Sequence, residues 1–319
     1  MLKHIFLLPR LLLVGAVLLG SGTLFAQELP RGAFIVRPAK TELNLSPGES
    51  KVAPLSLFNG TESPLHVEVS FEDIAPKVQR SFDDDATALL GEEAGKYPLR
   101  ELLQTPRSSF DVLSGKEVVV PITVTTPKNR EAGGRYGSVI FTFSPILSSS
   151  REGNANVALN SRVATLFYVR VNGEVKEEGK LAAFGLFNNA LFAPSPREGA
   201  PLRFQVAYEN TGTVHVNPYG RLTTRSILGK EEMLIVAPFA VLPEATRMLE
   251  VDLASLLRPG YYTAHLELNR GYGNIVDEKE VSFWIIPSLK QALLGLVALI
   301  LLGWLLKRSI RLSRHWVKQ

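Results

Sequence analysis

Hydrophobic and polar residues alternate along much of this chain. In "LHVEVSFE", residues 65–72, an apolar side chain occupies every second position and the positions between are polar. The stretch "LRFQVAY", residues 202–208, has the same period of two. A period of two over seven or eight residues predicts β-strands with one buried face.

Short runs rich in β-branched and aromatic residues continue this pattern through the middle of the chain. Further runs are "KVAPLSLFN", "EVVVPITVTT", "SVIFTF", "RVATLFYVRV", "TAHLELN" and "VSFWII". Turn sequences such as "SPGES", "AGGRYG" and "RPGYY" separate them, without intervening helical periodicity. Strands at this spacing are typical of β-sandwiches.

The strand-rich part is long enough for two such sandwiches, since about 260 residues lie between its ends. The charged stretch "VNGEVKEEGK" interrupts the series of apolar strand-like runs. We therefore place the domain boundary near Gly179, with sandwiches at residues 31–178 and 180–286. Each half has an asparagine-containing turn ("LFNGTESP", "YENTGTVHVNP") and, later, a Gly–Tyr corner before a strand ("GGRYGSVIFTF", "PGYYTAHLEL"). In immunoglobulin-like sandwiches, such a tyrosine bonds back to the preceding loop. The sequence therefore predicts an all-β body of two tandem immunoglobulin-like β-sandwiches.

An apolar segment follows the predicted sandwiches. Residues 287–306, "PSLKQALLGLVALILLGWLL", contain only Ser288, Lys290 and Gln291 as polar members. As a helix, 20 residues reach roughly 30 Å, the thickness of the hydrocarbon core. We expect a single C-terminal transmembrane α-helix; the alternative is a buried core helix.

A basic tail, residues 307–319, ends the chain without an acidic residue. Its cations are Lys307, Arg308, Arg311, Arg314 and Lys318. Basic residues beside a membrane span favour the cytoplasmic side, so we expect a cytoplasmic C-terminus. The same cations would also bind anionic lipid.

The first 26 residues have the plan of a signal peptide. Lys3 and Arg10 precede an apolar stretch at residues 11–19, and small residues then lead to Ala26. An uncleaved N-terminal anchor is the alternative. Either reading places the residues after 27 outside the cytoplasm, at the cell surface or in the periplasm. With a cleaved signal peptide and one C-terminal helix, we expect a single-pass membrane protein.

Charge and cysteine content narrow the function classes. Eight of the 35 lysines and arginines lie in the two ends of the chain. The body therefore contains 27 basic and 31 acidic residues. A body with net negative charge argues against nucleic acid as a partner. No cysteine is present, so neither disulfides nor thiol chemistry is expected.

One stretch inside the first sandwich lacks clear strand periodicity. Residues 72–109 form an insertion that mixes apolar and acidic side chains, and insertions of this length are uncommon unless they are functional or disordered. We predict a flap that binds a partner; the alternative is a loop that only covers the sandwich edge. The candidate residues are Asp83, Asp84, Asp85, Leu89, Leu90 and Tyr97.

The body shows no pattern of catalytic or metal-binding residues. Its histidines, His66, His215 and His265, are isolated, with no second ligand at zinc spacing. Neither a G-x-S-x-G elbow nor a phosphate loop occurs, and the triple aspartate lacks the pattern of a calcium loop. No spacing pairs a general acid with a general base, which argues against a polysaccharide-processing enzyme. We expect no enzyme, no cofactor and no metal.

Several segments resemble the WxL-interacting proteins of bacterial surfaces. They are "VRPAKTELNLSPGESKVAPLSLFNGTESPLHVEVSF", "GGRYGSVIFTF", "FQVAYENTGTVHVNPYG" and "VLPEATRMLEVDLASLLRPGYYTAHLEL", followed by the helix and basic tail. The resemblance implies tandem immunoglobulin-like domains held outside the membrane, the first binding peptidoglycan and the second a protein. The acidic insertion departs from the family, and no binding residue is carried over.

The sequence thus predicts a non-enzymatic, membrane-anchored adaptor that recognises cell-wall polymer or another surface protein. Binding would use exposed strand edges and loops. The alternative is a chaperone-like protein that acts by strand donation in surface-structure assembly. Residues 27–71 resemble the N-terminal domain of periplasmic pilus chaperones, although such chaperones are soluble and this chain has a predicted anchor.

Overall fold

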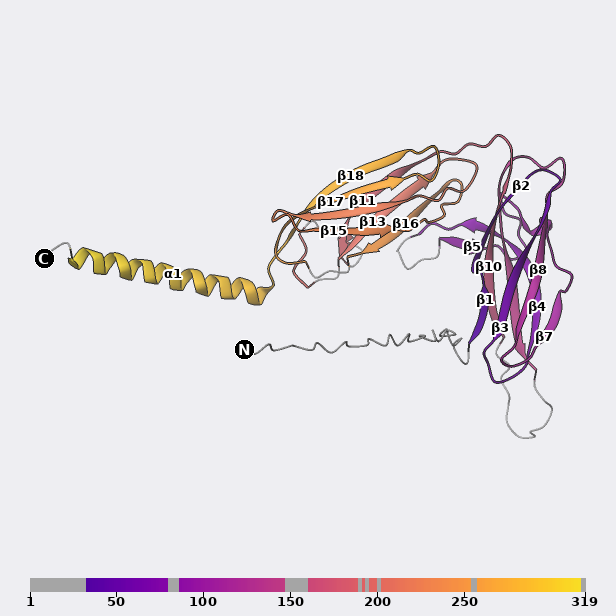
Figure 1. The fold of residues 1–319 in the computed structure, drawn as a ribbon, viewed down its shortest axis with the longest axis horizontal. Coiled ribbons are helices and arrows are strands. Elements are labelled where there is room, and N and C mark those ends of the chain that lie inside the picture. Colours follow the sequence, from indigo (N-terminus) through magenta and orange to yellow (C-terminus); the bar gives the residue numbers. More distant parts are fainter. Residues whose placement is uncertain are drawn as a thin grey trace, which may run out of the picture.

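The fold is two immunoglobulin-like β-sandwiches followed by one helix (Figure 1). The computed structural model describes residues 33–79, 86–146, 160–188, 191–192, 195–199, 202–253 and 257–316. The predicted signal peptide, residues 1–26, lies outside the described residues. The all-β class and the tandem sandwiches predicted from the sequence are confirmed.

The first sandwich packs a sheet of order β1-β3-β8-β6 against one of order β2-β10-β9-β4, with β5 and β7 paired to β4. The strands are β1 (Phe34–Arg37), β2 (Lys40–Leu45), β3 (Ser50–Asn59), β4 (Leu65–Pro76), β5 (Thr87–Leu89), β6 (Leu103–Gln104), β7 (Ser109–Val112), β8 (Glu117–Thr125), β9 (Gly133–Pro145) and β10 (Ser161–Val171).

The chain changes sheets between β1 and β2. β1 runs antiparallel to β3 in one sheet, while β2 runs parallel to β10 in the other. This switch leaves β10 with β2 on its outer side along only part of its length, as described below.

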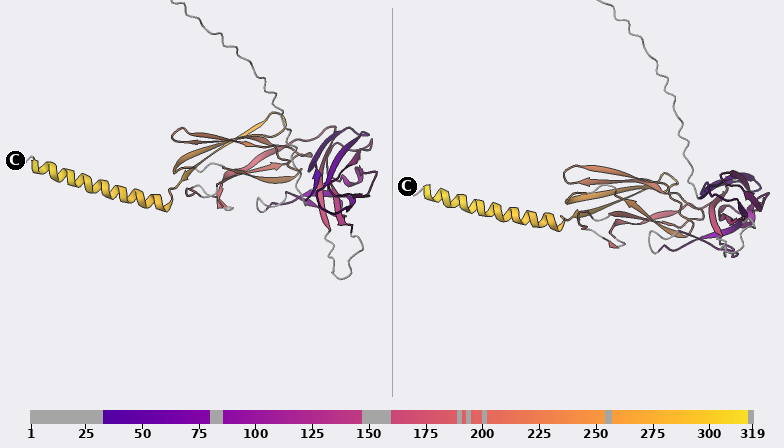
Figure 2. Two further views of the ribbon diagram at one scale, coloured as in Figure 1. Left: turned by 60° about the horizontal axis from the view of Figure 1, so that its bottom comes forward. Right: turned by 90° about the horizontal axis from the view of Figure 1, so that it is seen from below.

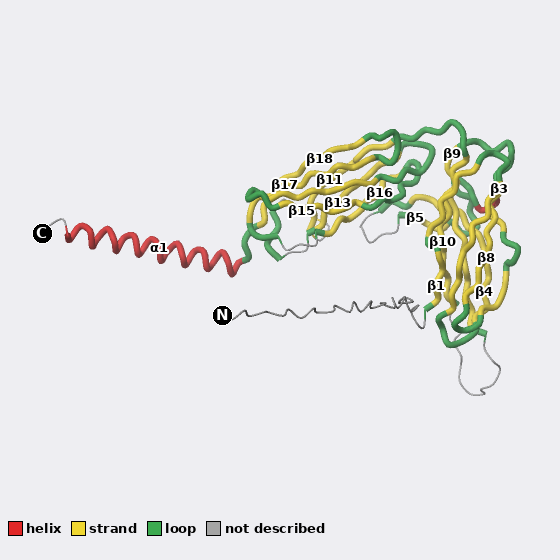
Figure 3. The backbone as a smooth tube through the Cα atoms, in the orientation of Figure 1, coloured by secondary structure: helices red, strands yellow, loops and turns green. Residues whose placement is uncertain are grey.

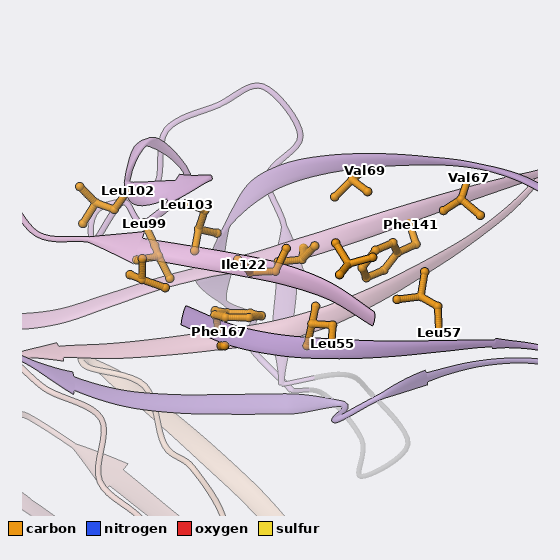
Figure 4. Packing of buried hydrophobic residues seen from close by; sticks show 14 of the residues in the cluster. Leu55, Leu57, Val67, Val69, Leu99, Leu102, Leu103, Ile122, Phe141 and Phe167 are labelled. Carbon is orange, nitrogen blue, oxygen red and sulfur yellow. The ribbon is translucent and has the colours of Figure 1, made fainter. Parts of the chain in front are cut away.

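The core of the first sandwich lies between its sheets, where alternate residues point inward (Figure 4). Val67 and Val69 of β4 are buried, as the period of two predicts, and they face Leu55 and Leu57 of β3. Phe141 lies among them. Most of the core therefore consists of every second side chain of the strands.

Much of the predicted insertion is part of this sandwich. β4 continues to Pro76 and pairs with β5, and a 3₁₀ turn at residues 100–102 leads into β6, which pairs with β8. Leu99, Leu102 and Leu103 are buried in the core. Residues 99–104 therefore fit the alternative of a covering segment, because their apolar side chains close the core.

The second sandwich packs a sheet of order β12-β11-β13-β16 against one of order β15-β14-β17-β18 (Figure 3). Leu222, Phe204 and Phe283 are among the residues buried between the sheets. The strands are β11 (Gly179–Asn188), β12 (Leu191–Phe192), β13 (Arg203–Asn210), β14 (Tyr219–Ser226), β15 (Glu231–Val236), β16 (Ala245–Asp252), β17 (Gly260–Asn269) and β18 (Val276–Ile285).

A buried asparagine ends an equivalent strand in each sandwich. Asn59 donates from Nδ2 to the carbonyls of Ser63 and Val112, at 2.9 Å each. Asn210 donates to the carbonyls of Val214 (2.9 Å) and Val241 (2.8 Å). Both carboxamides are fully buried. The repeated asparagine-containing turn in the sequence thus corresponds to one repeated structural device.

The predicted tyrosine corner is right for the second sandwich and wrong for the first. The hydroxyl of Tyr262 donates to the carbonyl of Arg258 at 2.9 Å. The hydroxyl of Tyr136 instead accepts the backbone N–H of His215, in the other sandwich, at 2.7 Å. Tyr136 therefore holds the two sandwiches together.

The C-terminal helix α1, Leu289–Trp316, leaves the second sandwich and extends away from it in all views (Figures 1 and 2). Residues 289–308 are long and apolar enough to cross a membrane, and none is buried. α1 continues beyond the predicted end at residue 306 because no glycine or proline interrupts the basic segment. Arg308 lies over the Trp304 ring, 5.4 Å from its centroid.

Candidate functional site

The two sandwiches meet through a small apolar cluster. Ile74, Tyr136 and Tyr168 of the first sandwich pack with Ala240 and Leu242 of the second, and all five are buried. We call these five residues the interdomain cluster. They fix one end of the second sandwich on the β4, β9 and β10 strands of the first.

Tyr136 is the centre of this contact. Its ring meets those of Tyr97, Tyr168 and His215 edge-on, with centroids 5.4–6.0 Å apart. Edge-to-face pairs at this distance add to the burial energy. Burial holds the pKa of Tyr136 far above its usual value, so the hydroxyl stays neutral.

Polar pairs surround the cluster. Glu42 Oε2 lies 3.7 Å from His215 Nε2, the distance of an ion pair rather than a hydrogen bond, and accepts Asn217 Nδ2 at 3.2 Å. His215, and next Lys40, hold the pKa of Glu42 at about 2 against an ordinary 4.5, although partial burial opposes them. Lys96 pairs with Glu244 at 2.6 Å.

A cavity of about 570 Å³ opens beside this contact, between the two sandwiches. Lys40 and Tyr168 line it from the first sandwich, and Phe239 and Arg247 line it from the second. Lys40 Nζ is paired with Glu42 Oε1 at 2.6 Å. Arg247 donates to the carbonyl of Ala240 at 2.7 Å and has no carboxylate partner in the described part of the chain. This guanidinium could therefore take an anion.

Part of β10 next to this cavity is an open strand edge. Residues 166–171 pair with β2, whereas residues 161–165 pair only with β9, and no described strand pairs with their outer side. The N–H of Leu166 points outward, to the carbonyl of Ala39 at 3.0 Å. By the period of two, the N–H groups of Arg162 and Ala164 point outward as well.

Apolar side chains are accessible behind this edge. Phe34 and Val36 of β1 and Val163 of β10 are partly buried and pack against the core of the first sandwich. They lie where β1 belongs to one sheet and β10 to the other. The open edge thus combines unpaired backbone groups with an apolar surface, the two features that an added strand needs.

The structure separates the residues predicted for the flap. Asp83, Asp84 and Asp85 lie outside the described residues. Leu89 is exposed on β5, and Leu90 is partly buried. Among the described residues of this set, Tyr97 reaches the interdomain contact, where its hydroxyl donates to Glu244 at 3.1 Å.

The predicted cytoplasmic cations lie on α1. Lys307 and Arg308 are exposed, and Arg311 and Arg314 belong to the same helix. Lys318 is outside the described residues.

Residues that form the cavity and open edge were missed by sequence reasoning. Lys40 and Arg247 have no neighbouring motif in the sequence, and His215 has no second ligand at zinc spacing that would mark it. Glu42 and His215 meet across 173 residues of sequence, so spacing carries no signal of their contact. The β10 edge was detectable only in general terms, as one of many predicted strands.

No family model and no curated protein matches this chain. Among solved structures it is similar to the YadV chaperone, at 10% identity, covering 78% of this chain and 99% of that one, with a TM-score of 0.36. It is also similar to the E. coli chaperone DraB (13%, 78% and 96%, 0.35) and to the class 5 fimbriae chaperone CfaA (12%, 80% and 100%, 0.34). These TM-scores lie below 0.5, so the similarity does not assign a function to this chain.

Proposed function

We propose that this protein is a membrane-tethered, non-enzymatic binding protein that captures an extended segment of another extracytoplasmic protein. The segment adds as a strand to residues 161–165 of β10. The observation that supports this most directly is the edge itself, where β2 covers only the second half of β10. The body lies outside the cytoplasm and the basic end of α1 inside.

A peptide suits this edge better than a wall polymer. An extended peptide presents alternating N–H and C=O groups at the spacing of the outward groups on Arg162 and Ala164. Its side chains also alternate, so every second one would cover Phe34, Val36 and Val163. The glycan strands of peptidoglycan, the other partner predicted from the sequence, offer no such ladder.

The cavity provides a place for an anionic end of the segment. A strand that runs parallel to β10, in line with β2, would end at Ala39 and Lys40, where the cavity begins. Arg247, which lacks a carboxylate partner among the described residues, would then pair with a carboxylate there.

The small size of the edge favours the chaperone-like role over the permanent adaptor. Five residues with an open outer side offer only a few hydrogen bonds to an added strand, each contributing about 0.5–1.5 kcal/mol net. Capture would therefore be reversible, as an assembly factor requires. Membership of the WxL-interacting family stays a prediction of the sequence.

The test uses two substitutions at one position. Ala164→Pro removes the outward N–H without breaking a bond to β9, whereas Ala164→Val keeps it. Tagged full-length protein is cross-linked in native membranes, and bound proteins are identified by mass spectrometry. We expect Ala164→Val to recover the same protein as the unmodified chain and Ala164→Pro to lose it.

Equal recovery by both variants would contradict strand addition at β10. Recovery of peptidoglycan fragments without any protein would support the wall-binding role instead. Matching melting temperatures for the two variants exclude misfolding as the cause of a loss.

A further inference from the structure

The end of the second sandwich nearest α1 exposes large apolar side chains. In the turn between β14 and β15, Leu228 is 92% exposed and Ile227 75%. Trp284 and Ile286, just before α1, are 57% and 43% exposed. Turns at the surface of soluble domains are normally polar, so this concentration is unusual.

These side chains form one surface although they come from distant parts of the chain. The N–H of Ile227 donates to the carbonyl of Tyr261 at 3.1 Å. Tyr261 lies directly opposite Trp284 in the β17–β18 pair, with ring centroids 5.1 Å apart. Ile286 follows two residues later. We call Ile227, Leu228, Tyr261, Trp284 and Ile286 the base patch.

Cations accompany the base patch. Lys230 lies in the same turn as Ile227 and Leu228, and Arg258 precedes β17. The backbone of Arg197 forms an isolated parallel β-bridge with that of Ile286. All three are exposed, and none has an ion pair within the described ranges. The neighbouring Glu231 is already paired with Arg225 at 3.1 Å. Apolar tips with unpaired cations are the composition of surfaces that bind anionic lipid.

The position of α1 places the base patch next to the membrane that the helix would cross. The helix leaves the second sandwich at the end away from the first sandwich (Figure 1), and it begins at Leu289, three residues after Ile286. If α1 spans the bilayer, the base patch lies at the level of the lipid headgroups. Aromatic rings are enriched at this level, where one part of the ring is apolar and another polar.

We propose that the base patch docks into the outer interface of the membrane that α1 crosses. Ile227 and Leu228 enter the boundary between headgroups and acyl chains, with Tyr261 and Trp284 beside them. The second sandwich is thereby held on the bilayer rather than swinging on a single connection. The proposal rests on α1 as a membrane span, but not on strand capture at β10.

The test follows the depth of one tryptophan in full-length protein. The chain has only three tryptophans, Trp284, Trp304 and Trp316. Replacing all three by Phe gives a protein without tryptophan fluorescence. Into it we place either Leu228→Trp or, as matched control, Ile275→Trp, an exposed residue (42%) before β18 at the opposite end of the sandwich. Each protein is reconstituted into vesicles of phosphatidylglycerol and phosphatidylcholine, with or without lipids brominated near the acyl carbonyl.

We expect brominated lipid to quench the Leu228→Trp emission, which is also blue-shifted, and to leave Ile275→Trp unchanged. Adding Ile227→Asp should reduce the quenching at Leu228→Trp. If the emission maximum of Leu228→Trp is that of a tryptophan in water and brominated lipid does not quench it, the docking proposal is overturned. A blue shift that depends on protein density and not on bromine would assign the patch to a second copy of this chain and also overturn it.

Extraction at alkaline pH separates this result from the state of α1. A protein that resists extraction and yet shows no quenching has an inserted helix and an undocked sandwich. That combination contradicts the proposal without affecting the membrane span.

Discussion

Buried polar side chains determine where the turns of this molecule lie. Asp73 is the clearest case, since it is 1% exposed and accepts three backbone N–H groups. Oδ1 takes those of Leu99 and Arg100 at 2.8 Å each, and Oδ2 that of Gly95 at 3.1 Å. One carboxylate thus ties residues 95–100 to the end of β4.

We therefore expect Asp73→Ala to destabilise the first sandwich by about 3 kcal/mol, because it leaves buried N–H groups without acceptors. Chemical denaturation of the full-length protein in detergent measures this. Glu92→Ala is the control, since Glu92 is exposed, and it should change stability by less than about 0.5 kcal/mol. Equal effects would mean that Asp73 does not organise the segment.

Glu42 makes the contact between the sandwiches sensitive to acid. Its pKa in the folded protein is about 2, lowered from 4.5, so it binds a proton more readily when unfolded. Its contribution to stability is therefore fully present above pH 4.5 and is lost as the pH falls towards 2. Glu42→Gln should lower stability at pH 6, and the difference from the unmodified protein should shrink between pH 4.5 and 2. A difference independent of pH over this range would contradict the role of the charge.

At the scale of elements, the period of two was a good guide to strands and a poor guide to the insertion. Val67 and Val69 fall inward as predicted because one side of β4 is fully covered. Leu99 and Leu103 are also buried, but in a turn and a two-residue strand that show no period. β5 pairs with β4, and β6 pairs with β8. A local alternation of residue types does not encode which strand each of them joins.

Two leucines of this segment test its role. Leu99 is fully buried, so Leu99→Ala should cost about 2–5 kcal/mol and lower the melting temperature by several degrees. Leu89 is 45% exposed on β5, so Leu89→Ala should cost far less. Thermal melts of both variants provide the comparison. If Leu99→Ala lowers the melting temperature only slightly, residues 99–104 would instead fit the prediction of a flap that can be removed without loss of stability.

The sequence predicts the type of the candidate site but not its position. The sequence indicated exposed strand edges as the means of binding, but not which edge. The open part of β10 arises because β1 and β2 belong to different sheets, and the cavity lies between the two sandwiches, lined by Lys40 from one and Arg247 from the other. Both depend on tertiary arrangement rather than on any local motif.

At the scale of the whole molecule, each sandwich has a core of its own. The interdomain cluster has five buried residues, whereas each sandwich encloses a much larger set. We therefore expect fragments 27–178 and 180–286 each to give a β-rich circular dichroism spectrum and a cooperative melt. A second fragment that folds only when the first is present would show that the halves share one folding unit.

The central claim is that another protein adds a strand to residues 161–165 of β10. A photo-reactive amino acid at Arg162, which is exposed on this edge, reports on it in intact cells, with Lys279, exposed on β18, as the control position. The account predicts a discrete protein adduct from position 162 that is absent from position 279 and disappears when Ala164→Pro is added. No adduct from position 162, or one that persists unchanged with Ala164→Pro, would contradict it.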